Sequence, residues 1–302
     1  MSKVIVTGCC GLLGQKLLKS LKGHEVVGFD LLDECPYSET EFEYRLVDIS
    51  DESNLESIIN YYHPDCIINS AGVTDVDGCE KNKALAFMSN VDGIENLVVI
   101  CEKNNIRLIQ LSTDYVFDGE KGPYSEDDKP NPMGYYGITK LNAEKIIIEN
   151  LDNYAILRTN VLYGIGIDVR MNFLNWVIDK LQNDKSLSVV TDQYNNPTLA
   201  ENLADVINEL VDSDYHGILN FGGKDYISRY KFAKAISKVF GFNDDLIQPL
   251  LSEELNQHAP RPLRGGVKND KALKLLTTKP SSIKEGLNLV KKQIESRLAK
   301  QR

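Results

Sequence analysis

The feature that most restricts the fold of this chain is a glycine-rich turn close to its N-terminus. An apolar stretch at residues 3–7 runs directly into the turn Gly8-Cys9-Cys10-Gly11-Leu12-Leu13-Gly14. Glycines at this spacing let the backbone turn sharply from a strand into a helix, and they let an anion approach the helix N-terminus closely. The pattern predicts a strand–turn–helix unit that binds a phosphate group and opens an α/β fold.

The first half of the chain alternates strand-like and helix-like segments. Strands are predicted at residues 3–7, 25–30, 44–47, 65–69, 107–112 and 154–159, and helices at 12–21, 51–62, 84–103 and 136–150. Strands separated by helices imply right-handed crossovers and a parallel sheet. Residues 1–160 are therefore expected to form a Rossmann-type, doubly wound nucleotide-binding domain.

The alternation loosens after residue 160. Helices are predicted at residues 172–182, 200–212, 228–240 and 283–297, with short strands near 188–190 and 218–221. We expect residues 161–302 to form a smaller α/β substrate-binding domain, with segments near 192–225 returning to the first sheet. The loop at 119–133 is rich in Gly, Pro and acidic residues, and loops of this length inside a domain are often functional.

Composition excludes several classes of protein. The 302 residues carry a net charge of −10, which argues against nucleic acid or an anionic membrane as the main partner. No run of apolar residues was identified that reaches the roughly 18 needed to span a membrane. The N-terminus lacks the pattern of a signal peptide, so a cytoplasmic location is expected.

The cysteines are expected to be reduced thiols that serve as small apolar residues. All six lie in the first third of the chain without a C-x-x-C pair, and the four histidines are scattered, so no metal site is predicted. Cys9 and Cys10 stand inside the glycine turn. Oxidation there, which would block a bound cofactor, is the alternative interpretation.

An acidic residue ends the second predicted strand. Asp30 stands where dinucleotide-binding folds place an acid that accepts a hydrogen bond from the ribose 2′-OH, and a carboxylate there repels a 2′-phosphate. We therefore expect a dinucleotide cofactor, with NAD(H) favoured and NADP(H) as the alternative. Asp48 would meet the adenine, unless it caps a helix. The full set of expected cofactor contacts is Gly8, Cys10, Gly11, Leu12, Leu13, Gly14, Asp30, Asp48, Ile49, Ser70, Ala71, Gly72, Thr74, Asn90, Ser112, Tyr136 and Lys140.

A second motif predicts chemistry. Tyr136 and Lys140 are four residues apart and so share one face of a predicted helix. The preceding strand ends in Ser112-Thr113. A tyrosine, a lysine and a hydroxyl residue placed together can protonate a carbonyl oxygen, and a reduced dinucleotide would supply hydride. The two motifs together predict carbonyl reduction.

These motifs resemble the extended short-chain dehydrogenase/reductase family and, within it, the dTDP-4-dehydrorhamnose reductase group. The resemblance spans most of the chain in order. It rests on Ser-Thr-Asp-Tyr-Val-Phe-Asp-Gly at residues 112–119, Tyr-Gly-x-Thr-Lys at 136–140 and Leu-Arg-Thr at 157–159. Further matches lie at residues 74–80, 123–132, 192–198 and 261–262.

The resemblance implies reduction of a 4-keto-6-deoxy sugar attached to a nucleoside diphosphate, most closely dTDP-4-dehydro-L-rhamnose to dTDP-L-rhamnose for polysaccharide precursors. Tyr136 would donate the proton, and Lys140 would bind the nicotinamide ribose and lower the tyrosine pKa. Thr113, with Ser112 as the alternative, would polarise the carbonyl. We assign Arg261 to the diphosphate, since an acidic chain needs a local cation there. The expected substrate contacts are Val76, Thr113, Asp114, Tyr115, Asn160 and Arg261.

Other functions stay open at this point. A dehydratase would carry Glu after Asp114, where this chain has Tyr115, so dehydration is disfavoured. The Tyr/Lys pair is shared by three alternatives: an epimerase, a reductase of another keto sugar, and a non-catalytic regulatory subunit of methionine adenosyltransferase. A homodimer also stays open. Val161 stands where the family has a Trp, and Asn195 stands where it has a Gly. Both departures leave the exact substrate open.

Overall fold

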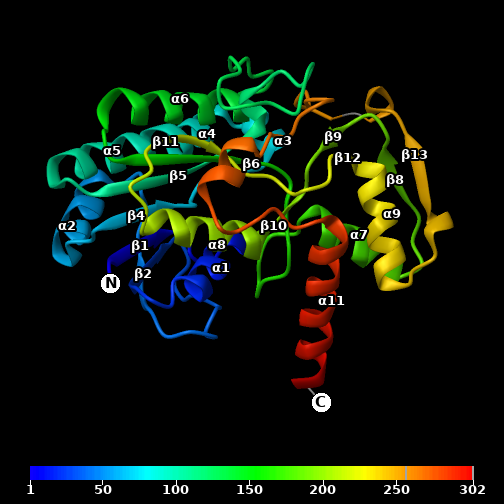
Figure 1. Cartoon of the computed structure of the whole chain (residues 1–302), viewed down its shortest axis with the longest axis horizontal. Coiled ribbons are helices and arrows are strands. Elements are labelled where there is room, and N and C mark those ends of the chain that lie inside the picture. The colour runs from blue at the N-terminus through cyan, green and yellow to red at the C-terminus, as the bar shows by residue number, and fades with distance from the viewer. Residues whose placement is uncertain (256, 301–302) are drawn as a thin grey trace.

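The computed structural model describes residues 1–255 and 257–300, and a seven-stranded sheet lies at its centre (Figure 1). All of its neighbouring strands are parallel. In spatial order the strands are β11 (Gly217–Asn220), β6 (Tyr154–Thr159), β5 (Arg107–Thr113), β4 (Cys66–Asn69), β1 (Lys3–Thr7), β2 (Glu25–Asp30) and β3 (Glu43–Leu46). The predicted doubly wound parallel sheet is confirmed.

Helices cover both faces of this sheet, so its strands are apolar on both sides. Val4 and Val6 of β1 pack in one cluster with residues of α1 and α8, whereas Ile5 packs in the other with residues of α2 and α5. The helices of the first face are α1 (Leu12–Ser20), α8 (Ala200–Val211) and α10 (Asp270–Leu275). Those of the second face are α2 (Glu52–Tyr62), α5 (Gly93–Asn104) and α6 (Tyr135–Asn150).

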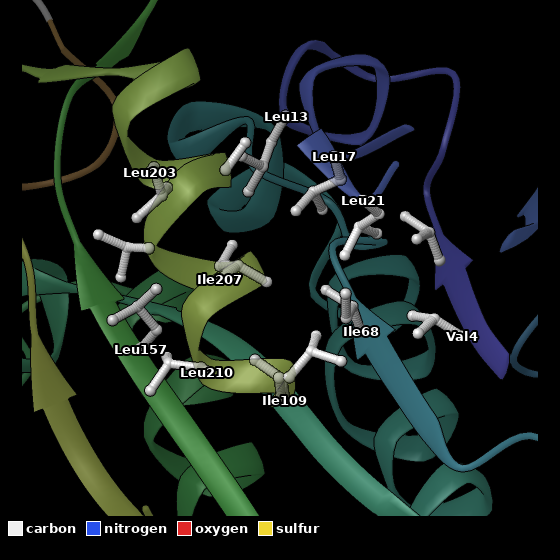
Figure 2. Packing of buried hydrophobic residues seen from close by; sticks show 14 of the residues in the cluster. Val4, Leu13, Leu17, Leu21, Ile68, Ile109, Leu157, Leu203, Ile207 and Leu210 are labelled. Carbon is white, nitrogen blue, oxygen red and sulfur yellow. The ribbon is translucent and has the colours of Figure 1, made fainter. Parts of the chain in front are cut away.

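Figure 2 shows how α8 closes the first face against α1 and the strands. Leu203, Ile207 and Leu210 recur at helical spacing on α8 and are fully buried. They belong to the same cluster as Leu13 and Leu17 of α1. Together with β11, α8 is a part of the chain beyond residue 160 that lies on the central sheet. The boundary predicted at residue 160 stays a prediction.

The long helix predicted at residues 84–103 is wrong as a single α-helix. The structure divides it into α4 (Lys83–Phe87), a π-helical segment η1 (Met88–Asp92) and α5. A Cβ on Gly93, where α5 begins, would lie 2.7 Å from Ile49 Cγ1, so this point of the helix is pressed against the segment after β3. Such π segments are often found at functional sites, and this one carries Asn90.

The same stretch is the most apolar long helix among the described residues. Lys83–Asn104 is helical throughout and is long and apolar enough to cross a membrane by length and composition. Half of its most apolar window is buried inside the protein. The buried residues, including Ile94, Leu97 and Val98, belong to the cluster on the second face of the sheet. The stretch therefore packs as a core helix of this fold.

A second group of elements lies beside the sheet, on the right of Figure 1. It contains α7 (Phe173–Gln182), α9 (Arg229–Phe240), α11 (Ile283–Lys300) and the parallel pair β8 (Leu187–Val190) and β13 (Ile247–Leu250). Its core includes Leu174, Phe232 and Leu287. The remaining short elements are β7 (Leu162–Tyr163), β9 (Tyr194–Asn195), β10 (Thr198–Leu199), β12 (Ile227–Ser228), α3 (Val76–Lys81), η2 (Asp114–Val116), η3 (Asp244–Leu246) and η4 (Ser252–Glu254).

The loop at 119–133 is held by its own contacts. The Tyr124 ring stacks on Phe117 at 4.2 Å between centroids, and its hydroxyl donates a hydrogen bond to Asp118. Its backbone N–H donates to Gly266 O at 3.0 Å. The loop therefore connects the end of β5 to the C-terminal segment around residue 266, and both border the candidate site.

Candidate active site

The glycine turn between β1 and α1 is built by contacts that no side chain would permit. Gly8 has φ +67°, and a Cβ on it would lie 2.7 Å from Ala71 N. A Cβ on Gly14 would lie 2.2 Å from Gly8 O. Gly11 caps α1 without a side-chain hydrogen bond, so the N–H groups of the first turn face a cradle suited to a phosphate. The residues present therefore fit the predicted dinucleotide.

Asp30 is tied to this turn. Its Oδ2 accepts a hydrogen bond from Cys10 N and its Oδ1 from Leu31 N, both at 2.8 Å. Each carboxylate oxygen has a second lone pair for a further donor. Asp30 therefore holds the turn in place and can still accept a bond from a ribose hydroxyl.

The residues expected after β4 line the neighbouring edge of the turn. The Ser70 hydroxyl donates to Thr7 O at 2.6 Å, and Ala71 lies against Gly8. Gly72 has φ +150°, and Thr74 is exposed. Small residues here keep the space above the turn open.

Asn90 proves to be a positioning residue in this structure. Its Oδ1 accepts from Val73 N at 2.8 Å, and its Nδ2 donates to Val73 O and to Thr139 Oγ1 at 3.0 and 3.2 Å. The amide thus joins the segment after β4 to helix α6. Its donors are already used by the protein, which leaves little for the cofactor contact predicted for it.

The two residues predicted after β3 have local partners. Asp48 Oδ1 accepts from the Ser50 N–H and hydroxyl at 2.8 and 2.7 Å. Asp51, not Asp48, is the N-cap of α2. The Ile49 side chain is buried against Gly93. These contacts use one of the two carboxylate oxygens of Asp48.

Tyr136, Lys140 and Thr113 meet at the carboxyl ends of the strands. Tyr136 and Lys140 occupy successive turns of α6, and Thr113 is the last residue of β5. The Thr113 hydroxyl lies close enough to the Tyr136 oxygen to lower the pKa of that phenol in part, and it donates a hydrogen bond to Asp114 Oδ1 at 3.4 Å. A Cβ on Gly137 would lie 2.1 Å from Tyr115 O, so only glycine lets α6 approach β5 this closely.

Burial controls the protonation of this pair. It raises the pKa of Tyr136 and lowers the pKa of Lys140 to about 8, although Glu144 opposes the second shift. The predicted lowering of the Tyr136 pKa by Lys140 is therefore not observed here, because desolvation outweighs every other influence on the phenol. Tyr136 is held as a neutral proton donor, and Lys140 can change charge near neutral pH.

A buried ion pair supports the catalytic helix. Arg158 donates from Nε and Nη2 to the two carboxylate oxygens of Glu144 at 2.9 and 2.6 Å, and the side chains are only 2% and 1% exposed. The Ser112 hydroxyl also donates to Glu144. Ser112 is thereby committed to this network, which leaves Thr113 as the hydroxyl directed at Tyr136. In the sequence, only the four-residue spacing of Lys140 and Glu144 on one helix face pointed to this network.

Asp114 connects the catalytic strand to the C-terminal segment. Its Oδ2 accepts from Gly266 N at 2.7 Å, and it is 2% exposed. Burial raises its pKa to about 6, although the Gly266 hydrogen bond opposes the shift. Asp114 therefore acts as a buried anchor for one wall of the site, rather than as a free contact.

Asn160 is also an anchor. It donates from Nδ2 to Asn196 Oδ1 at 2.8 Å and accepts from Asn196 N at 3.1 Å. Asn196 in turn bonds Val267, so the two amides hold the segment after β6 against the C-terminal segment. Val161, beside Asn160, has φ +40°, an unusual conformation for a β-branched residue.

The predicted diphosphate ligand, Arg261, already has an anionic partner. Its Nη2 lies 3.0 Å from Asp77 Oδ1, and its Nη1 donates to Ala259 O. Val76 and Tyr115 lie nearby at the start of α3 and in η2, where the Tyr115 ring meets that of Tyr136 edge-on at 5.7 Å. Asp77 neutralises much of the charge that Arg261 would offer to a phosphate.

Arg229, the first residue of α9, was not predicted. Its guanidinium lies over the Phe173 ring at 5.0 Å and is close enough to Tyr115 for that phenol to raise its pKa. Burial lowers its pKa, and among residues 1–255 and 257–300 no carboxylate forms an ion pair with it. No local pattern marks this arginine, because only the packing of α9 brings it to Tyr115.

The family comparison agrees with this arrangement. The model of the RmlD substrate binding domain matches residues 2–296. The chain belongs to this family. It is an extended short-chain dehydrogenase/reductase family, as the sequence motifs predicted.

Individual relatives agree with the family. A probable low-salt glycan biosynthesis reductase, Agl14 of Haloferax volcanii, is 34% identical over 86% of this chain and 87% of its own. Methionine adenosyltransferase 2 subunit beta of Xenopus laevis is 30% identical over 86% and 78%. The dTDP-4-dehydrorhamnose reductase of Bacillus anthracis, solved in complex with NADP, has a TM-score of 0.87 and 29% identity, covering 97% of this chain and 99% of that one.

Replacement of Glu144 by Gln tests the buried network. Glu144→Gln keeps the shape of the side chain but leaves the Arg158 charge without its partner, so we expect a loss of about 3–5 kcal/mol in the free energy of unfolding. Urea unfolding followed by circular dichroism measures this. Glu56→Gln, which removes the exposed ion pair with Lys103, is the control and should change stability little. Equal effects of the two variants would contradict the assignment.

Proposed function

We propose that the protein reduces a nucleotide-linked 4-keto-6-deoxy sugar with NAD(P)H, and that dTDP-4-dehydro-L-rhamnose is the substrate to test first. The observation that carries the proposal is the convergence of Tyr136, Thr113 and Lys140 beside the glycine turn. Membership of the RmlD substrate binding domain family and the similarity to solved dTDP-4-dehydrorhamnose reductases support it.

In this mechanism the chain's own residues bind, orient and protonate. When bound, the reduced nicotinamide supplies the hydride. Thr113 donates a hydrogen bond to the sugar carbonyl oxygen, which stabilises the charge that develops there. Tyr136 gives its proton to the same oxygen, and its raised pKa keeps that proton in place until the oxygen becomes basic. Lys140 holds the nicotinamide ribose and stabilises the phenolate that remains.

Asp30 favours NADH in this proposal. Its carboxylate is fixed by Cys10 N and Leu31 N, so it cannot swing away from a 2′-phosphate without breaking both bonds. Leu31 and Leu32, which follow it, offer no positive charge. The Bacillus anthracis relative was solved with NADP, which makes the preference of this chain a point for measurement.

Arg229 is the better candidate for the substrate diphosphate than Arg261. Arg261 is paired with Asp77, whereas Arg229 is a partly buried cation near Tyr115 that forms no ion pair with a carboxylate among the described residues. The Asp114 carboxylate attracts Arg229 without forming an ion pair, so a phosphate would supply a close counter-charge, and guanidinium groups bind phosphate through two parallel hydrogen bonds. Both arginines lie close enough to Tyr115 to lower its pKa, so they belong to the same wall of the site.

The similarity to methionine adenosyltransferase 2 subunit beta supports a second candidate, a non-catalytic regulatory subunit. Both functions would use the dinucleotide site, so cofactor binding alone does not separate them. Turnover of a keto sugar separates them. The two-domain division, a homodimer and a cytoplasmic location remain predictions of the sequence.

A spectrophotometric assay tests the reductase directly. The protein is mixed with dTDP-4-dehydro-L-rhamnose and either NADH or NADPH, and the absorbance of the reduced cofactor is followed. We expect turnover, with a higher kcat/KM for NADH. Tyr136→Phe should lose about a hundredfold or more in kcat because the proton donor is gone, while still binding NADH in a fluorescence titration. Absence of turnover with both cofactors would refute the rhamnose assignment.

The two arginines can be compared in the same assay. Arg229→Met keeps the bulk of the side chain against Phe173 but removes its charge, so we expect KM for the nucleotide sugar to rise about tenfold or more, the loss of one charge-assisted hydrogen bond. Arg261→Met should raise KM less, since Asp77 already neutralises that charge. If Arg261→Met has the larger effect on KM, the original assignment from sequence is the correct one.

Lys140 should impose an alkaline limit on activity. Its pKa of about 8 means that it is charged below this pH and neutral above it. We expect kcat to fall as pH rises through about 8, because neutral lysine no longer stabilises the phenolate. In Lys140→Arg the charge persists to high pH, so kcat should begin to fall at a higher pH even if its maximal value is lower. If kcat of the variant still falls near pH 8, another group is responsible for the decrease.

A further inference from the structure

Three thiols gather beneath the glycine turn, although the sequence predicted no such cluster. The sulfur atoms of Cys9, Cys10 and Cys35 all lie within 4.8 Å of one another. Cys9 and Cys10 belong to the turn itself, and Cys35 belongs to the segment between β2 and β3. The Cys35 thiol is near enough to Cys10 to raise the pKa of the Cys10 thiol further. The fold thus joins two loops that are separate in the chain.

The cluster lies on the protein side of the turn. Cys9 is 0% exposed and Cys10 5% exposed, and both belong to the core cluster that includes Leu13 and Tyr37. Cys35 is only partly buried and packs against the same cluster. A reagent from solvent therefore reaches Cys35 first, while the face of the turn that would meet a phosphate stays free of sulfur.

The charges around the thiols distinguish a bound cation from a disulfide. A thiophilic cation needs thiolates, but burial raises the pKa of the Cys9 and Cys10 thiols, and the carboxylate of Asp30 raises them further. Three thiolates in this place would add negative charge to a buried region that has no cation among the groups acting on these thiols. A disulfide carries no charge, so it suits the same surroundings.

The adjacent pair Cys9 and Cys10 is not suited to forming a disulfide. Cys9 and Cys10 are consecutive, and consecutive Cα atoms are about 3.8 Å apart, below the roughly 4.4–6.8 Å of ordinary disulfides. Their sulfur atoms lie 3.9 Å apart. Cys35 approaches from another segment and brings its sulfur within 4.8 Å of both, and Cys10 is the more exposed of the two turn thiols, 5% against 0%.

We propose that Cys10 and Cys35 form a reversible disulfide that weakens dinucleotide binding at the glycine turn. The oxidant is a small-molecule disulfide. The Cys35 thiolate attacks one of its sulfurs and releases one thiolate, and Cys10 then attacks the Cys35 sulfur, loses its proton and releases the second thiol. Two protein thiols are oxidised by two electrons in total, and one disulfide is reduced to two thiols.

The coupling to the cofactor runs through Asp30. Bond formation brings the two sulfurs to about 2.0 Å. Gly8 and Gly14 are in such close contact with backbone atoms that the turn has little freedom, so the segment after β2 must move instead. That segment begins at Leu31, whose N–H holds Asp30 Oδ1, while Cys10 N holds Oδ2. Its movement displaces the carboxylate that would bind the ribose. This inference rests on the dinucleotide binding of the proposed function.

The test uses the full-length protein after reduction, after exposure to glutathione disulfide, and after renewed reduction with dithiothreitol. Peptide mapping by mass spectrometry identifies the cross-link, and NADH fluorescence titration measures affinity. We expect a Cys10–Cys35 disulfide and a fall in NADH affinity of at least about fivefold, the lower end of typical couplings between sites. Renewed reduction should restore the affinity.

Two variants provide controls. Cys35→Ser changes a partly exposed side chain and should bind NADH normally when reduced, but it should lose the response to glutathione disulfide. Cys101→Ala removes a buried thiol of α5 that lies outside the cluster and should keep the full response. A response that persists in Cys35→Ser would overturn the assignment to this pair.

Three further results overturn the inference, and a fourth identifies a failure of the proposed function. Absence of a Cys10–Cys35 cross-link overturns the disulfide. A cross-link without a change in NADH affinity overturns the coupling. Zinc that copurifies with the wild-type protein and is lost in Cys35→Ser overturns the choice of a disulfide over a cation. If the reduced protein does not bind NADH at all, the dinucleotide binding of the proposed function fails. If the protein reduces a keto sugar and binds NADH equally before and after oxidation, only the thiol inference is refuted.

Discussion

The buried pair of Glu144 and Arg158 is the interaction on which the arrangement of the candidate catalytic side chains depends. Arg158 belongs to β6 and Glu144 to α6, so their two hydrogen bonds join the catalytic helix to the sheet. Ser112 at the end of β5 joins the same carboxylate. Lys140 lies one turn before Glu144 on the helix. Because an unpaired charge in the interior is very costly, the pair holds α6 in one position and with it Tyr136.

Glycines decide how closely the other parts of the site approach. Gly137 permits the contact between α6 and Tyr115 O that brings Tyr136 to Thr113, and Gly8 permits the contact between the turn and Ala71. At each place a Cβ would meet backbone atoms that cannot move aside. The space for a cofactor and the distance between proton donor and hydroxyl thus follow from backbone packing.

The far wall of the site is assembled from segments that are distant in the chain. Asp114 holds Gly266, and Asn160 with Asn196 holds Val267, so the C-terminal segment is fixed against β5 and β6. Arg229 reaches Tyr115 from α9. Buried polar residues that looked like ligand contacts in the sequence serve here as anchors, and a cation that had no motif, Arg229, lies beside Tyr115 at the candidate site.

The sequence by itself determined the parallel sheet, most helix positions, the glycine turn and the pairing of Tyr136 with Lys140. These features depend on local periodicity and on the backbone conformations that glycine allows, and both are written in neighbouring residues. Only the tertiary structure decided that α8 packs against α1, that Arg261 is neutralised by Asp77, that Arg229 lies beside Tyr115 and that Cys35 joins Cys9 and Cys10. The helix at 84–103 shows the same limit, because its π segment accompanies contacts of Gly93 and Asn90 with other elements. Distances between side chains of separate elements arise from how those elements pack, and no local pattern in the chain encodes them.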